Sequence, residues 1–204
     1  MSSKDHWENI YDNKSLSEVS WYQPLPETSI NLVKEASSNL EASIIDIGGG
    51  DSFLAESLIN EGYSSLTVLD ISSKALERAK ERLGNTAKSV DYIATDILNF
   101  NPSDAYEVWH DRAAFHFLTE KDDVDRYVKI ATNSILPGGS LILGTFAENG
   151  PDKCSGIIIN KYSIAELSEV FSAHFDLISG FNQEHDTPFD TIQNFTFIHL
   201  KKKK

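Results

Sequence analysis

The sequence predicts an α/β fold, with a doubly wound, mostly parallel seven-stranded sheet, an antiparallel last strand and helices on both faces. Short apolar runs of strand length alternate along the chain with stretches of helical periodicity. The last two runs are instead joined by a segment without a helical pattern, which favours an antiparallel final pair. Three consecutive glycines follow the first run, where the first strand of such a fold turns into a helix.

The expected strands are the apolar runs, several of which are rich in Val, Ile and aromatic side chains. They cover residues 43–47, 66–69, 90–94, 105–109, 139–146, 175–180 and 194–200. Helical spacing of apolar side chains predicts helices over residues 25–40, 52–60, 72–83, 122–136 and 163–171. Ser72 is the expected N-cap of its helix, and Pro137-Gly138-Gly139 is expected to end the helix before it. Residues 181–193 are predicted to form a loop.

Length and composition predict a single domain. The chain has 204 residues, of which 40% are hydrophobic and 24% charged, and this is enough for one sizeable core. The sheet domain is expected over residues 41–204, after an aromatic and helical segment of residues 1–40 that is too short for a core of its own. Because Trp21 and Tyr22 stand in a turn-like stretch, we expect this segment to cover a bound ligand. A helix packed on the sheet is the alternative.

The charge and cysteine content argue against several function classes. The net charge is −13, from 31 acidic and 18 basic residues, so we expect no nucleic-acid partner and no membrane partner. Cys154 is the only cysteine, the first nine residues are polar, and no apolar stretch approaches the ~20 residues that cross a bilayer. We therefore expect a cytoplasmic protein. No His or Cys cluster has metal-ligand spacing, so no metal is expected.

The glycine triplet predicts a ligand-binding turn. Gly48, Gly49 and Gly50 follow a buried strand, and glycine lets the backbone adopt positive φ and approach a ligand closely. The dinucleotide fingerprint needs a third glycine where this chain has Phe53, whose ring disfavours close helix–strand packing. Asp51 also puts a carboxylate where a pyrophosphate would bind. The turn therefore disfavours NAD and FAD and favours a nucleoside without phosphates.

Three aspartates accompany the first three strands. Asp46 lies inside an apolar strand, where an unpaired carboxylate is costly, so a ligand cation or nearby backbone amides are expected to satisfy it. Asp70 follows Gly50 by about twenty residues, the spacing of a ribose-diol acceptor. Asp96 is placed to accept from an adenine amino group. Each acid alone is typical of a helix cap, but together they predict a nucleoside site.

These residues resemble the motifs of the class I S-adenosylmethionine (SAM)-dependent methyltransferases. Residues 46–50 look like the D-x-G-x-G motif of that family, and Asp70 and Asp96 match the acids after its second and third strands. Residues 133–139 resemble its L-x-P-G-G turn. The resemblance covers roughly residues 40–200 and implies SAM as the cofactor.

The resemblance also implies where the cofactor is held. The glycine backbone would meet the methionine moiety, Asp70 the ribose hydroxyls, and Asp96 with Ile97 the adenine. The full set of expected cofactor-binding residues is Trp21, Asp46, Gly48, Gly49, Gly50, Asp70, Ile71, Asp96, Ile97 and His110.

The tip of the fourth strand is expected to lie beside the transferable methyl group. His110, Asp111 and His116 are therefore the candidate catalytic residues. Methyl transfer depends mainly on alignment and needs no metal, although an oxygen or nitrogen nucleophile can need a base such as histidine. Other roles remain open: a structural one for His110, an ion pair of Asp111 with Arg112, and packing between phenylalanines for His116.

The methyl acceptor is expected to be a small molecule, because no added recognition domain is visible. A protein acceptor, methylated on lysine or a carboxylate, is the first alternative. A non-catalytic SAM-binding module is the second, and an NAD-dependent oxidoreductase is disfavoured by Phe53 and Asp51. Cys154 and His185 stand on loops expected near the acceptor, and neither is assigned a role.

Overall fold

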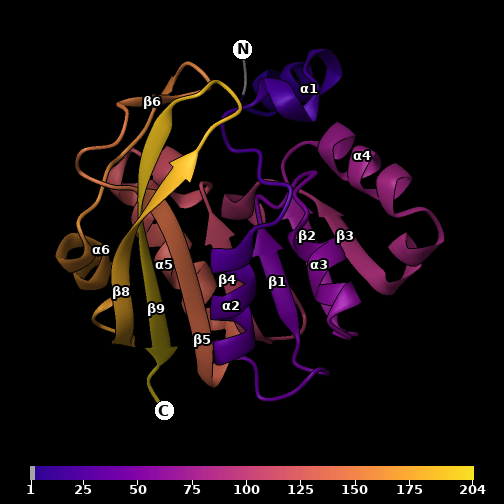
Figure 1. Ribbon diagram of the computed structural model, residues 1–204. Coiled ribbons are helices and arrows are strands. Elements are labelled where there is room, and N and C mark those ends of the chain that lie inside the picture. The colour runs from indigo at the N-terminus through magenta and orange to yellow at the C-terminus, as the bar shows by residue number, and fades with distance from the viewer. Residues whose placement is uncertain (1–2) are drawn as a thin grey trace.

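The computed structural model describes residues 3–204, so Met1 and Ser2 of the expected N-terminal segment lie outside the described residues. Seven strands form one sheet in the order β3-β2-β1-β4-β5-β9-β8 (Figure 1). Their bounds are β1 Ile44–Ile47, β2 Leu66–Asp70, β3 Val90–Ala94, β4 Tyr106–Arg112, β5 Ile135–Phe146, β8 Phe175–Asp186 and β9 Ile192–Lys202. Strand β9 runs antiparallel to both β5 and β8, and the other pairs are parallel. The predicted fold class is confirmed.

Helices cover both faces of the sheet (Figure 1). One face carries α2 Glu27–Ala36, α3 Leu54–Asn60 and α4 Ser73–Leu83, and the other carries α5 Lys121–Ser134 and α6 Ile164–Phe171. Helix α1, Ser3–Asn13, packs against α4. The short elements are the hairpin β6 Lys153–Cys154 and β7 Ile157–Ile158, and the 3₁₀ helices η1 Leu16–Glu18, η2 Gly84–Ser89, η3 Ile97–Asn99 and η4 Phe115–Phe117.

Alternation along the central strands divides the core into two layers. In β1, Ile44 packs with the α2 and α3 layer, whereas Ile45 packs with the α5 and α6 layer. This follows from the two-residue period of a strand, and it explains why β1 is buried at every position. Ser72 caps α4 as predicted, because its Oγ accepts a hydrogen bond from the backbone N–H of Ala75 at 3.2 Å.

Two predicted boundaries around β4 and β5 were wrong. Strand β4 continues to Arg112, beyond its predicted end at residue 109. Helix α5 ends at Ser134, so the Pro137-Gly138-Gly139 turn lies within β5 and does not end the helix. The register between β4 and β5 shifts there from Tyr106↔Ile135 to Val108↔Ser140. Proline has no N–H to donate to a ladder, and Gly138 has a φ of +74°, so this stretch bulges from the strand.

The predicted loop over residues 181–193 was also wrong, because most of it pairs between β8 and β9. Strand β8 is the edge of the sheet, and most of its side chains are exposed. A strand with so much exposed surface tolerates the polar residues Asn182, Gln183 and Glu184, whose composition imitates a loop. The predicted antiparallel pairing of the last two strands is confirmed.

The N-terminal segment is more helical than predicted. Helix α2 is shorter than the expected 25–40, and α1 was not predicted as a helix. Trp21 and Tyr22 lie in a turn between η1 and α2, as expected. Among residues 3–204, no helix has both the length and the apolarity needed to cross a membrane.

Candidate functional site

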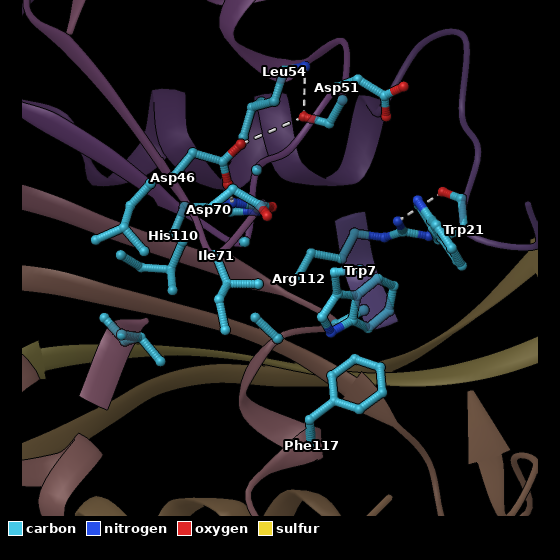
Figure 2. A pocket seen from close by; sticks show the side chains of 18 of the residues that line it. Trp7, Trp21, Asp46, Asp51, Leu54, Asp70, Ile71, His110, Arg112 and Phe117 are labelled. Carbon is cyan, nitrogen blue, oxygen red and sulfur yellow. Dashed lines mark hydrogen bonds and ion pairs between the residues drawn. The ribbon is translucent and has the colours of Figure 1, made fainter. Parts of the chain in front are cut away.

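A cavity of about 350 Å³ lies at the carboxyl ends of the first four strands, where ligands bind in doubly wound sheets (Figure 2). Residues at or just after β1, β2, β3 and β4 line it. They are Asp46, Ile47, Gly48, Gly49, Leu69, Asp70, Ile71, Thr95, Asp96, Ile97, Leu98, His110 and Arg112. The cavity therefore gathers most of the cofactor-binding residues predicted from the sequence.

The glycine turn is packed so closely that side chains would not fit. Gly48 and Gly50 have φ values of +63° and +48°, in the left-handed region that favours glycine. A Cβ atom on Gly48 would lie 2.6 Å from the Cβ of Ala114, and one on Gly50 would lie 2.8 Å from the hydroxyl of Tyr11. Gly48 and Gly49 line the cavity. Gly50 lies behind Tyr11 instead of on the cavity wall.

Asp70 and Asp96 each have one carboxylate oxygen without a hydrogen-bond partner among the described residues. In Asp70, Oδ1 accepts from the Ser72 N–H at 2.8 Å, and Oδ2 has no hydrogen-bond partner among the described residues. In Asp96, Oδ1 accepts from the Leu98 N–H at 2.9 Å, and Oδ2 is likewise without a partner in residues 3–204. Burial raises the pKa of Asp70 to about 7. Two carboxylates in the same cavity can thus accept hydrogen bonds, one from the sugar hydroxyls and one from the base amino group of a nucleoside.

Asp46 and His110 bond to each other across the sheet. Asp46 Oδ1 lies 2.7 Å from His110 Nδ1, and His110 Nε2 lies 2.9 Å from the Ser29 hydroxyl on α2. Ser52 Oγ donates a longer bond of 3.4 Å to Asp46 Oδ2. Asp46 is therefore satisfied mainly by a histidine, a partner that the sequence did not indicate. Both side chains also line the cavity, but the ring nitrogens of His110 are already engaged.

Asp111 faces the opposite side of the sheet from the cavity. Its Oδ2 accepts from the Tyr127 hydroxyl at 2.6 Å, and its Oδ1 accepts from the backbone N–H groups of Ala114 and Phe115. Because neighbouring strand residues point to opposite faces, Asp111 forms no ion pair with Arg112. Burial raises the pKa of Asp111 to about 6. The predicted contact of Asp111 with the reacting groups is not supported, because it holds the turn after β4.

His116 is also separated from the cavity. The side chain is fully buried against the rings of Phe117 and Phe146, and it is absent from the cavity wall. Burial lowers the pKa of His116 to about 3, and neither ring nitrogen has a hydrogen-bond partner within residues 3–204. The structure therefore places His116 as a packed, neutral side chain outside the cavity wall, which does not support its predicted catalytic role.

Arg112 is the cavity residue that sequence reasoning missed. Its Nη1 donates to the Trp21 carbonyl at 3.1 Å, and its guanidinium lies 4.7 Å from the centre of the Phe195 ring. Strand alternation could have revealed it: if Asp111 points to one face of the sheet, its neighbour Arg112 points to the other face. Cys154 also lines the cavity, and burial raises the pKa of its thiol to about 12. His185 bonds to the Ser20 carbonyl at 2.7 Å and lies outside the cavity wall.

Aromatic side chains of the N-terminal segment close the cavity. Trp7 lies edge-on to Phe117, with ring centres 5.2 Å apart, and to Trp21 at 5.7 Å (Figure 2). Tyr22 packs against Phe53 at 6.0 Å. The segment contributes ten lining residues: Ser3, Trp7, Tyr11, Leu16, Val19, Trp21, Tyr22, Gln23, Pro26 and Ser29. Among the residues described, no group of three or more His, Cys, Asp or Glu is arranged to hold a metal.

A family model described as a methyltransferase domain matches residues 44–139, which include the glycine turn, Asp70 and Asp96. The N-methyltransferase NodS from Bradyrhizobium japonicum WM9, in complex with S-adenosyl-L-homocysteine (SAH), has the same fold. The match has a TM-score of 0.74, covers 100% of both chains and shows 15% sequence identity. Residues 44–139 of the chain thus match a methyltransferase domain, and its fold is that of solved structures described as SAM-dependent methyltransferases.

The relatives that the chain resembles are named for different kinds of methyl acceptor. The chain is 27% identical over 110 residues to malonyl-[acyl-carrier protein] O-methyltransferase 1 of Ilyobacter polytropus, covering 53% of this chain and 40% of that protein. It is 27% identical over 124 residues to the eEF1A lysine and N-terminal methyltransferase of Mus musculus, covering 60% of this chain and 18% of that protein. The chain thus spans less than half the length of both relatives.

Proposed function

We propose that this chain binds SAM and transfers its methyl group to a small-molecule acceptor. The observation that carries the proposal is the pairing of Asp70 with the glycine turn in one covered cavity. Gly48, Gly49 and Asp70 line the same cavity, and Asp70 Oδ2 has no hydrogen-bond partner among the described residues, so bare backbone and an available carboxylate oxygen face one space. That combination suits a nucleoside whose hydroxyls donate to Asp70 while its amino-acid chain follows the turn.

The residues of the chain would hold the cofactor in three parts. Gly48 and Gly49 would face the methionine moiety, Asp70 with Ile71 the ribose, and Asp96 with Ile97 the adenine. SAM supplies a methyl group on a positively charged sulfur. Trp21 and the other aromatic residues of the cover would exclude water and hold the acceptor in line with that methyl, which is the main source of rate in such a displacement.

A small acceptor is favoured by the enclosure of the cavity. Ten residues of the N-terminal segment lie over it, whereas a protein side chain needs an open groove to enter. The net charge of −13 also favours acceptors other than nucleic acids. With a single cysteine, Cys154, we further propose that the protein works in the reducing cytoplasm.

Calorimetry with SAH tests the cofactor assignment. We expect SAH to bind, and we expect Asp70→Ala to weaken binding by at least tenfold, or about 1.4 kcal/mol, because the sugar hydroxyls lose their acceptor. Asp91→Ala is the matched control, since Asp91 is an exposed acid on the neighbouring strand β3. Tight NADH binding together with no SAH binding would overturn the assignment.

Radiolabelled SAM tests the acceptor class. The protein is incubated with the label and either a metabolite extract or a protein lysate, and the labelled products are separated by size. Label in small molecules is the expected result. Label confined to protein would replace the proposal with the protein methyltransferase alternative, and binding without any transfer would indicate a non-catalytic SAM-binding module.

A further inference from the structure

Arg112 is a partly buried cation with no carboxylate paired to it. No carboxylate of residues 3–204 lies within 4 Å of its nitrogen atoms, and its Nη2 is buried with no hydrogen-bond partner there. The other two arginines near the glycine turn are paired, Arg78 with Asp51 at 3.0 Å and Arg82 with Glu56 at 3.1 Å. In a chain with 31 acidic and 18 basic residues, a partly buried arginine without a carboxylate partner needs a physical explanation.

The neighbours of Arg112 hold its position without neutralising it. Nη1 donates a hydrogen bond to the Trp21 carbonyl, and the guanidinium packs against the Phe195 ring. Cys154 is also near, but burial raises the pKa of its thiol to about 12, so it stays uncharged at neutral pH. Asp46 is committed to His110. Burial lowers the pKa of Arg112 to about 10, which still leaves it protonated.

Arg112 also points into the ligand cavity. It is the only Lys or Arg among the described residues that line the wall, which otherwise carries five aspartates: Asp46, Asp51, Asp70, Asp96 and Asp123. In Figure 2 its side chain extends away from Asp46 and Asp70 toward Trp21. The cavity therefore has an acidic wall, suited to hydroxyl and amino donors, and one separate cationic position.

We infer that Arg112 is the anion-binding residue of this cavity and pairs with a carboxylate of the bound ligand. A guanidinium with a free, buried N–H edge binds a carboxylate through strong charge-assisted hydrogen bonds. Two ligands can supply that carboxylate: the methionine end of the cofactor, or an acidic group on the acceptor. The second source defines the substrate class as small acids. Both sources rest on the proposed function, whereas the anion site itself does not.

Four proteins, the unchanged one and three variants, and three probes test the inference by calorimetry. The variants are Arg112→Gln, Arg112→Lys and, as a control, Arg126→Gln on the exposed face of α5. The probes are SAH, 5′-methylthioadenosine, which has no carboxylate, and benzoate, added with and without saturating SAH. If the cofactor supplies the carboxylate, Arg112→Gln weakens SAH at least tenfold and leaves 5′-methylthioadenosine unchanged. If the acceptor supplies it, SAH affinity is kept, and Arg112→Gln abolishes benzoate binding to the SAH-loaded protein.

A merely structural role for Arg112 predicts different results. Loss of the Trp21 bond and the Phe195 contact would then lower the melting temperature of ligand-free Arg112→Gln. We expect no such loss, because removal of an unpaired buried charge relieves its desolvation cost, and we expect Arg112→Lys to retain part of the affinity. Unchanged SAH affinity in Arg112→Gln, with no benzoate binding to the unchanged protein, would overturn the inference. If neither nucleoside binds the unchanged protein, the proposed function fails, and benzoate without SAH still tests the anion site.

Discussion

Asp70 is a buried carboxyl group on whose ionisation the proposed ribose contact depends. Burial raises the pKa of Asp70 to about 7, and only the ionised form accepts from two hydroxyls. SAH affinity should therefore rise between about pH 6 and about pH 8, and in Asp70→Asn it should be weak and independent of pH. Between about pH 4 and about pH 7, Asp70 is protonated in the folded chain but ionised in the unfolded chain. The free energy of unfolding should thus fall from about pH 4 to about pH 7, and less so in the variant. Calorimetry and urea unfolding across this range check both parts.

Tyr127 supports the turn after β4 through a buried network. Its hydroxyl donates to Asp111 at 2.6 Å and accepts from the Trp109 indole N–H at 3.0 Å. Tyr127→Phe leaves both partners unsatisfied, so we expect it to lower the free energy of unfolding by about 1–3 kcal/mol in urea denaturation. SAH affinity should change little, because the network faces away from the cavity.

Tyr92→Phe is the matched control for Tyr127→Phe. The Tyr92 hydroxyl is buried and has no hydrogen-bond partner in the described chain, so its removal should be neutral or slightly stabilising. Equal losses of stability in the two variants would contradict the role given to Asp111, since removal of any buried hydroxyl, bonded or not, would then explain both.

At this scale, sequence patterns located acids better than they located their partners. The spacing of Asp70 and Asp96 from the glycine turn is a local property of two βα units, and both line the cavity as expected. The partner of Asp46 depends on how β1 and β4 align and on where α2 packs. Ser29 and His110, for example, are 81 positions apart. Composition and spacing carry no information about such pairings. The face of the sheet to which Asp111 and Arg112 each point can be predicted only once β4 is known to extend to Arg112.

At the scale of elements, the Glu8 carboxylate connects α1 to the N-terminus of α4. Glu8 accepts from the Ser72 and Ser73 hydroxyls and from the backbone N–H groups of Ser73 and Lys74, at 2.9–3.2 Å. A helix N-terminus attracts negative charge. Glu8→Gln should therefore speed hydrogen exchange of the α1 amides by up to about tenfold, while the exchange of the central strands stays the same.

Asp12→Asn is the control for Glu8→Gln on the same helix. It removes an exposed ion pair with Lys74, which contributes little in water, so α1 exchange should be nearly unchanged. Burial acts to raise the pKa of Glu8, but hydrogen bonds from Ser72, Ser73 and Lys74 hold it below the usual 4.5. The contact should thus persist above pH 4.5 and weaken as the pH falls below it. Rapid α1 exchange already at neutral pH would contradict this docking.

Element boundaries were predictable where packing and local pattern agree. Strand β3 was predicted to the residue, and Ser72 was correctly predicted as a cap. Strand β8 was predicted too short, because an edge strand accepts polar side chains that imitate a loop. The proline and glycines of β5 were assigned to the end of a helix, because their fit as a bulge depends on the neighbouring strand β4.

At the scale of the whole molecule, ligand binding and folding are linked. SAH at one hundred times its dissociation constant should stabilise the folded chain by about 2.7 kcal/mol. For a domain of this size, that corresponds to a rise in melting temperature of roughly 5–10 °C. Thermal unfolding with and without SAH measures it, with NADH as the control that should produce no shift. A larger rise with NADH than with SAH would contradict the nucleoside assignment.

The architecture was predictable because alternation of strands and helices leaves few ways to bury both faces of a parallel sheet. The arrangement of residues 3–40 was not, because that segment packs on surfaces contributed by the rest of the chain. Its helix α1 lies beside α4 in Figure 1, far from it in sequence. The match to the methyltransferase domain covers residues 44–139, which include the glycine turn, Asp70 and Asp96.

The docking of α1 has a consequence for how fast a bound nucleoside leaves the cavity. Trp7 and Tyr11 line the cavity, and charged side chains help to hold the helix that carries them on α4: Glu8 bonds to the N-terminus of α4, and Arg78 donates to the Tyr11 carbonyl. We expect release of a bound nucleoside to require movement of this helix away from the cavity. Because dissolved ions weaken such anchors, its residence time should shorten as ionic strength increases.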